Sequence, residues 1–171
     1  MFCSISQKNT TGDSALDQSV YELKRQLLKS YHIKERKTIA ISAFARNDLL
    51  RTNSKYASVI PKLGIVYANT LQNEMFQPDK YDLIERQRID SILRELTYEQ
   101  IGLGGDGANN IKLSGADLVL LGNLQLREET IRVDARIVDL SNGKILSVGT
   151  SILPISNFIE DLYNEIPLEK K

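Results

Sequence analysis

Residues 115–145 read GADLVLLGNLQLREETIRVDARIVDLSNGKI and contain the clearest signs of secondary structure in the chain. The run at 118–121 is apolar on both faces of a strand, which is typical of a central strand with packing on both sides. Apolar and polar residues alternate at 131–137, as in a strand with one buried face. An Asn-Gly dipeptide at 142–143 favours a tight hairpin, so a further strand is expected at 145–153. Together these segments predict an antiparallel three-stranded meander.

The segment before the meander has the pattern of a parallel unit. Residues 81–96 read YDLIERQRIDSILREL. A short strand is expected at 81–84, and a helix is expected at 86–98 because its apolar residues recur at helical spacing. After a glycine-rich bend, the strand at 117–126 follows. A strand, a helix and another strand predict a βαβ unit with a right-handed crossover.

Four more elements complete the pattern. Residues Ser14 to Asp17 have the form of a capping box, with Asp in place of the usual Glu, and begin an amphipathic helix. A strand is expected at 37–44 because β-branched and aromatic residues lie there between charged segments. A helix with a proline in its first turn is expected at 58–77, and Ser156 is expected to cap a last helix.

We therefore predict an α/β fold. Its mixed five-stranded sheet combines a βαβ unit with the antiparallel three-stranded meander, and its helices pack mainly on one face. The chain of 171 residues is long enough to bury one substantial core. A single domain is expected at 14–167, after a flexible tether at 1–13 and before a charged tail at 168–171.

The order of these motifs resembles that of a known group of proteins. A strand that ends in Glu-Arg, an amphipathic helix, a small-residue turn, two strands, an Asn-Gly turn and a last strand follow one another. In this order the chain is similar to the FlgO/CsgG/LpoB group of bacterial envelope proteins, which also includes the N-terminal domain of TolB. The resemblance covers roughly residues 35–153. It implies a domain that binds other proteins.

The resemblance also implies a role. We expect a non-enzymatic, FlgO-like accessory protein of the cell envelope that binds other envelope proteins or copies of itself, with a possible flagellar association. It would be periplasmic and tethered to the outer membrane. One alternative is an activator of cell-wall synthases, as in LpoB. Another is a subunit of an oligomeric assembly, as in CsgG.

The strand at 131–137 supplies the candidate binding surface. Its apolar residues would face the helices, whereas Arg132, Asp134 and Arg136 would share the opposite face. These three residues are the partner-binding candidates. A polar strand face can also be an ordinary solvated surface.

Cys3 is the only cysteine in the sequence, so no internal disulfide can form. It lies before a polar stretch at 4–13 that has the composition of a flexible tether. A lipid-modified cysteine followed by such a tether is the arrangement found at the start of mature bacterial lipoproteins. We expect lipidation at Cys3 and an apolar signal segment encoded upstream of Met1. The alternative is an ordinary free cysteine.

Composition and isolated motifs argue against other classes. Lys and Arg together number 22, as do Asp and Glu, so no overall positive charge attracts nucleic acid or an anionic membrane. The single histidine, His32, cannot build an ordinary zinc site or a catalytic triad by itself. Glu85 and Arg86 are expected to stabilise a helix N-terminus rather than to catalyse a reaction. No catalytic residue, cofactor or metal is therefore predicted.

The glycine-rich segment 102–107 is the one stretch that favours a ligand. Such loops let backbone amides approach a phosphate group. This one follows a helix rather than a strand, and it lacks the Gly-Lys-Ser/Thr of a phosphate-binding loop. A helix C-cap followed by a loop is the simpler interpretation. A nucleotide- or ligand-binding domain stays open as a third function.

Overall fold

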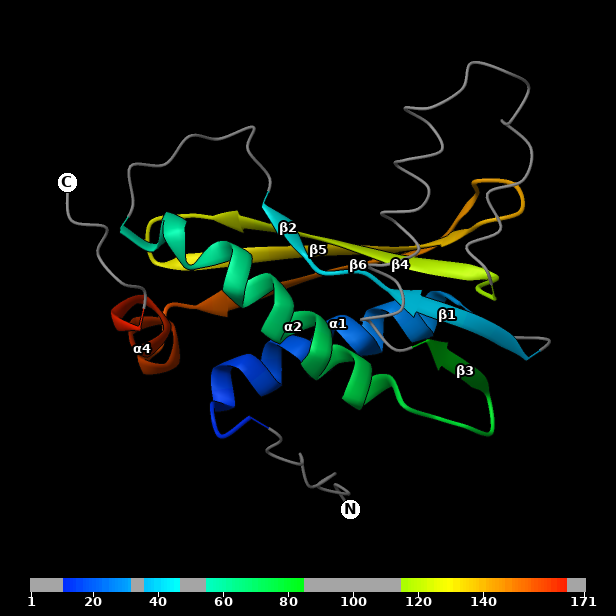
Figure 1. The fold of residues 1–171 in the computed structure, drawn as a ribbon, viewed down its shortest axis with the longest axis horizontal. Coiled ribbons are helices and arrows are strands. Elements are labelled where there is room, and N and C mark those ends of the chain that lie inside the picture. The colour runs from blue at the N-terminus through cyan, green and yellow to red at the C-terminus, as the bar shows by residue number, and fades with distance from the viewer. Residues whose placement is uncertain (1–10, 32–35, 47–54, 85–114, 166–171) are drawn as a thin grey trace.

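The computed structural model describes residues 11–31, 36–46, 55–84 and 115–165. The centre of this described part is a mixed sheet, shown nearly edge-on in Figure 1. Five strands lie side by side in the order β3 (Tyr81–Ile84), β1 (Lys37–Ile41), β4 (Leu118–Leu126), β5 (Thr130–Asp139) and β6 (Ile145–Pro154). The two-residue strand β2 (Ala45–Arg46) also pairs with β4. The predicted mixed five-stranded sheet is confirmed.

The sheet combines two kinds of pairing. β1 runs parallel to β3 on one side and to β4 on the other. β4, β5 and β6 form the predicted antiparallel meander, and Gly143 adopts a positive φ of 71° in the turn between β5 and β6. Helix α2 (Ile60–Met75) connects β1 to β3, so these elements form a βαβ unit. This is not the predicted βαβ unit: β1 lies between its two strands, β3 and β4, and the helix expected between them at 86–98 lies outside the described residues.

The helices lie mainly on one face of the sheet, as expected (Figure 1). Helix α1 (Ser14–Ser30) buries the predicted apolar stripe of Leu16, Val20, Leu23 and Leu27. Its N-cap is Asp13, whose side chain accepts a 2.7 Å hydrogen bond from the amide of Leu16. The expected capping box beginning at Ser14 is therefore wrong by one residue, because Ser14 is already helical.

The remaining helices differ slightly from expectation. A 3-10 helix, η1 (Lys55–Ser58), precedes α2, which begins at Ile60 rather than at 58. Helix α4 (Asn157–Asn164) follows Ser156, which takes the predicted N-cap position. The Ser156 hydroxyl makes no capping hydrogen bond, and within the described part of the chain it is buried without a partner. None of the described helices is long and apolar enough to cross a membrane.

Phe44 is held between two glycines. Its ring lies against Gly122 of β4, and its carbonyl lies against Gly64 of α2, so that a Cβ atom at either position would clash with Phe44. The Phe44 amide donates a 3.2 Å hydrogen bond to the Gly64 carbonyl. The segment between β1 and β2 therefore passes in direct backbone contact with α2.

Helix α1 approaches β6 closely because β6 has small residues on its inner face. A Cβ atom at Gly149 would lie 3.2 Å from the carbonyl oxygen of Leu23. Beside it, the hydroxyls of Ser19, Tyr67 and Ser151 form a buried triangle with O–O distances of 2.9, 2.9 and 3.0 Å. Burial raises the pKa of Tyr67 to about 12, against the opposing effect of the two serine hydrogen bonds. This triangle joins α1, α2 and β6.

The contact of Phe44 with Gly122 gives the first prediction. Replacing Gly122 with Ala forces the Phe44 ring to move in a filled core, and such overpacking typically costs about 1–3 kcal/mol. Chemical denaturation should show this loss in the free energy of unfolding. Gln18→Ala, at an exposed position of α1, is the control and should change stability little. A Gly122→Ala variant as stable as the wild type would show that Phe44 is not confined.

Candidate functional site

The candidate site is the sheet face that α1 and α2 leave uncovered. On β4, β5 and β6 every second side chain points to this side, which we call the open face. Strand register places these side chains in three rows across the strands. The rows are Leu121, Arg136 and Val148; Asn123, Asp134 and Thr150; and Gln125, Arg132 and Ile152.

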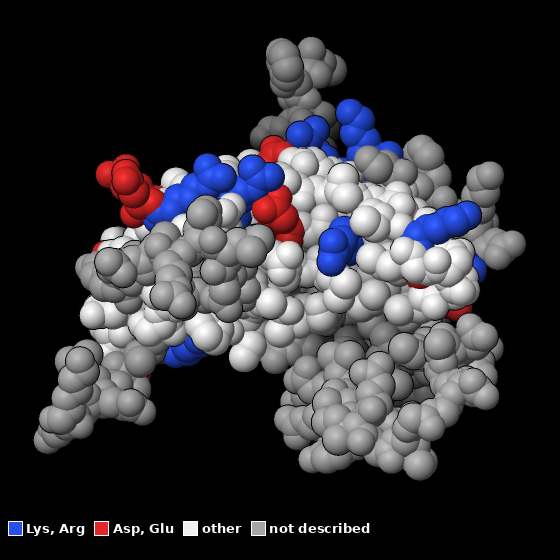
Figure 2. Space-filling model, turned by 90° about the horizontal axis from the view of Figure 1, so that it is seen from above, with Lys and Arg blue, Asp and Glu red and all other residues white. Residues whose placement is uncertain are grey.

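The open face mixes charge with exposed apolar surface. Figure 2 looks onto this side of the molecule and shows a largely uncharged surface on which lysine and arginine side chains stand singly or in small groups. Val148 is 61% exposed and Ile152 is 49% exposed. Toward β1 the same face becomes apolar, where Ala40, Ala116 and Val119 form a small buried cluster. β4 is therefore central and has packing on both faces, as its sequence predicts.

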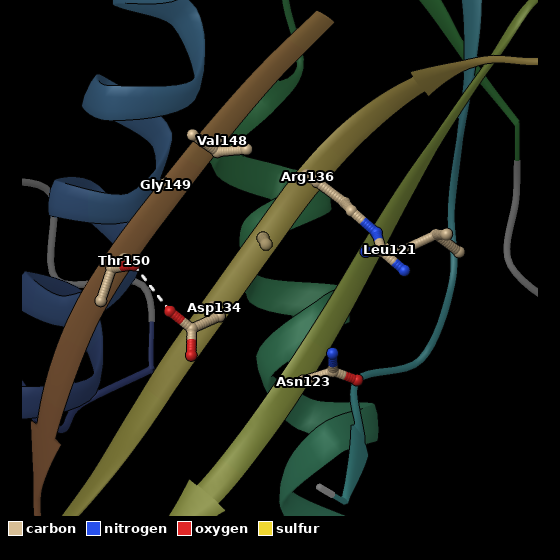
Figure 3. Close-up of a pocket in the computed structure, with 8 residues that line it drawn as sticks. Leu121, Asn123, Asp134, Arg136, Val148, Gly149 and Thr150 are labelled. Atoms are coloured by element: carbon tan, nitrogen blue, oxygen red, sulfur yellow. Dashed lines mark hydrogen bonds between the residues drawn. The ribbon is translucent and has the colours of Figure 1, made fainter. Parts of the chain in front are cut away.

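Two of the three predicted binding residues contact each other. Arg132 donates to both carboxylate oxygens of Asp134 at 2.9–3.1 Å. The hydroxyl of Thr150 on β6 donates a 2.6 Å hydrogen bond to the same carboxylate, drawn as a dashed line in Figure 3. The Arg132 hydrogen bond lowers the pKa of Asp134 below its usual range, although partial burial opposes this shift. Asp134 is thus an ionised group with its partners already in place.

Arg136 is the third predicted residue, and it stands apart from this ion pair. It is exposed, and no ion pair to it is found within the described part of the chain. In Figure 3 its side chain extends from β5 across β4 toward Leu121. The structure thus brings Arg132 and Asp134 together and leaves the Arg136 guanidinium available. That these residues bind a partner stays a prediction.

A shallow hollow of about 190 Å³ lies beside Arg136. Its floor is the backbone at Ala135 and Gly149, whose own positions face the helices. Around the floor stand the side chains of Leu121, Asn123, Asp134, Arg136, Val148 and Thr150 (Figure 3). The contributions of β4 and β6 were not identified from sequence. The alternation along β6 and the hairpin register could have placed Val148 and Thr150 beside Arg136.

The other positions considered from sequence lie outside the described residues. These are Cys3, His32, Glu85, Arg86 and the glycine-rich segment 102–107. Among the residues that the structure describes, no group of three or more His, Cys, Asp or Glu side chains is placed to hold a metal ion. Within the described residues, the open face is therefore the candidate site.

The edge of β6 borders the open face, and a side chain from α1 covers it. β6 is the last strand of the described sheet, so one of its edges has no neighbouring strand there. The Gln26 amide donates a 2.7 Å hydrogen bond to the Thr150 carbonyl and accepts a 3.0 Å bond from the Thr150 N–H. These are the two bonds that an added antiparallel strand would make. Gln26 thus occupies a position where another strand could pair.

The chain is similar to a protein family and to solved structures of other proteins. The family model described as FlgO protein matches residues 21–158. The LpoB C-terminal domain from Escherichia coli is 12% identical, with a TM-score of 0.54, over 82% of this chain and 98% of that domain. The corresponding domain from Salmonella enterica is 14% identical, with a TM-score of 0.51, over 81% of this chain and 98% of the other. At these identities the two structures show a shared fold. No curated protein sequence matches the chain significantly.

The covered edge gives a prediction about association. Gln26→Ala leaves both backbone groups of Thr150 open to another strand, and unpaired edges promote association. Analytical ultracentrifugation should show more self-association for this variant than for the wild type at the same concentration. Gln26→Glu can still accept from the Thr150 N–H, but it sets a carboxylate oxygen against the Thr150 carbonyl oxygen, so both variants should lower the melting temperature. The exposed variant Gln18→Ala is the control, and matching behaviour of all variants would contradict the proposed role of Gln26.

Proposed function

The chain belongs to the FlgO protein family, and on this premise we propose that it is a non-enzymatic accessory protein of the bacterial cell envelope. It binds other envelope proteins through the open face of β4, β5 and β6. The families that its sequence resembles use this type of domain to bind proteins. We place it in the periplasm, tethered to the outer membrane, with a flagellar association as the specific form of its role.

One observation carries this proposal: exposed apolar side chains and an available arginine share one face. Val148 and Ile152 lie on β6, next to Arg136 and Arg132 on β5. Exposed apolar residues beside polar ones are typical of protein interaction sites, and arginine is enriched at their energetic centres. The described helices α1 and α2 lie on the opposite face of the sheet (Figure 1).

The proposed tether is the N-terminal segment. Cys3 would carry the lipid, and the polar residues 4–13 would separate it from α1. A single acyl chain binds membranes only weakly, whereas two or more chains anchor a protein stably. A multiply acylated Cys3 would hold a domain of zero net charge at a membrane without a basic surface patch.

Site-specific photo-crosslinking in living cells tests the binding face. A photoreactive amino acid at Val148, on the open face, should yield crosslinks to other envelope proteins. The same amino acid at Gln18, on the outer surface of α1, is the matched control and should yield few. Crosslinks from Gln18 with none from Val148 would contradict the proposal.

The identity of the crosslinked protein distinguishes the possible roles. A component of the flagellar basal structure supports the FlgO-like role. A cell-wall synthase would favour an LpoB-like activator, and a second copy of the chain would favour an assembly subunit. Crosslinks to cytoplasmic proteins alone would contradict an envelope function of any of these kinds.

Fractionation and mass spectrometry test the anchor. The native protein should carry lipid at Cys3 and appear in the outer-membrane fraction. Cys3→Ser should release it into the soluble fraction, because the acyl chains that hold it are lost. Ser4→Ala keeps the cysteine and is the control. An unmodified Cys3 in protein recovered from the soluble cytoplasm would contradict both the anchor and the location.

A further inference from the structure

The hollow beside Arg136 has the size of one side chain. Pockets that hold cofactors or drug-sized molecules enclose about 300–1,000 Å³. The hollow on the open face encloses about 190 Å³ and lies on the surface of the sheet rather than inside the protein. Its dimensions therefore suit an anchoring residue of a partner protein better than a cofactor.

The polar groups around the hollow differ in availability. The carboxylate of Asp134 already accepts hydrogen bonds from Arg132 and Thr150. The guanidinium of Arg136 is exposed and free of ion pairs within the described residues. Arg132, Asp134 and Arg136 sum to a net charge of +1, since two cations oppose one anion. The group that remains available to a partner is therefore the guanidinium of Arg136, which is positively charged and donates hydrogen bonds. A carboxylate would complement it.

Apolar side chains stand on both sides of Arg136. Strand register places Leu121 on β4 and Val148 on β6 in the same row as Arg136. Val148 is 61% exposed, so it can gain burial from a partner. Apolar surroundings exclude water from a charged contact and increase its contribution to binding. An acidic residue with an apolar neighbour would use both parts of this row.

We propose that the hollow anchors one aspartate or glutamate of a partner protein. The guanidinium of Arg136 donates two hydrogen bonds to its carboxylate, and Leu121 and Val148 pack against an aliphatic or aromatic residue next to the acid. Arginine presents a planar pair of donors that matches a carboxylate. This inference rests on the proposed use of the open face and specifies the chemistry of the partner.

Selection from a phage-displayed library of random twelve-residue peptides tests this anchor. Peptides enriched on the wild-type protein should share an acidic residue beside an apolar one. For a synthetic copy of the best peptide, exchange of that acid for its amide should raise Kd about tenfold or more, because a charge-assisted pair is lost. Arg136→Gln should have the same effect, and combining the two changes should add little further loss.

Two controls separate this contact from general effects of charge and stability. Arg25→Gln removes an exposed arginine of α1 that pairs with Glu22, and it should leave peptide binding unchanged. Arg136→Lys keeps the positive charge but loses the paired donors, so its affinity should fall between those of the wild type and Arg136→Gln. Melting temperatures of the three variants should match that of the wild type.

Several outcomes would overturn the inference. They are a selection without enrichment, a consensus that lacks an acid, and undiminished peptide binding by Arg136→Gln. The crosslinking experiment at Val148 keeps this failure distinct from failure of the proposed function. Crosslinks from Val148 combined with any of these outcomes would mean that the open face binds partners without an acidic anchor. Absence of crosslinks from Val148 would instead contradict use of the open face itself.

Discussion

The confinement of Phe44 between Gly64 and Gly122 is the contact on which the arrangement of this domain depends. Through Phe44, the segment after β1 contacts α2 on one side and β4 on the other. The Phe44 ring lies 5.0 Å from the ring of Tyr67, whose hydroxyl belongs to the buried triangle with Ser19 and Ser151. One aromatic pair and three hydroxyls thus link α1, α2, β4 and β6. Because buried hydroxyls are costly without partners, the triangle favours this one packing of the helices over others.

The close packing of α1 explains why partners would use the open face rather than the sheet edge. Ser147, Gly149 and Ser151 leave room for α1 beneath β6, and Ser147 donates a 2.7 Å hydrogen bond to the Leu27 carbonyl. From that position Gln26 reaches the edge of β6 and occupies both backbone groups of Thr150. Helix α1 therefore packs on β6 and β5, and its Gln26 side chain blocks backbone pairing at the centre of the β6 edge. Among the residues that the structure describes, none of the helices covers the centre of the opposite face, where Arg136 and Val148 are exposed.

Sequence periodicity predicted most of this architecture, because strands and helices leave local patterns. The alternation in β5 placed Arg132, Asp134 and Arg136 on one face, and the Asn-Gly turn placed β6 beside them. The position of β1 between β3 and β4 was not predicted, since it depends on pairing between residues far apart in the chain. The roles of Gly64, Gly122 and Gln26 were missed for the same reason. The N-cap at Asp13 was missed because Ser14 is an equally good capping residue by type.

The two arginines of β5 have different roles although they are two residues apart on the same face. Arg132 is bound to Asp134, and Thr150 on the neighbouring strand donates a hydrogen bond to the same carboxylate. This carboxylate is therefore neutralised within the face instead of repelling an incoming anion. Arg136 keeps its hydrogen-bonding capacity and lies between two apolar side chains. In the proposed complex, this one available charge would select the acidic partner group, and the apolar surface around it would supply contact area; such a division gives selectivity among partners.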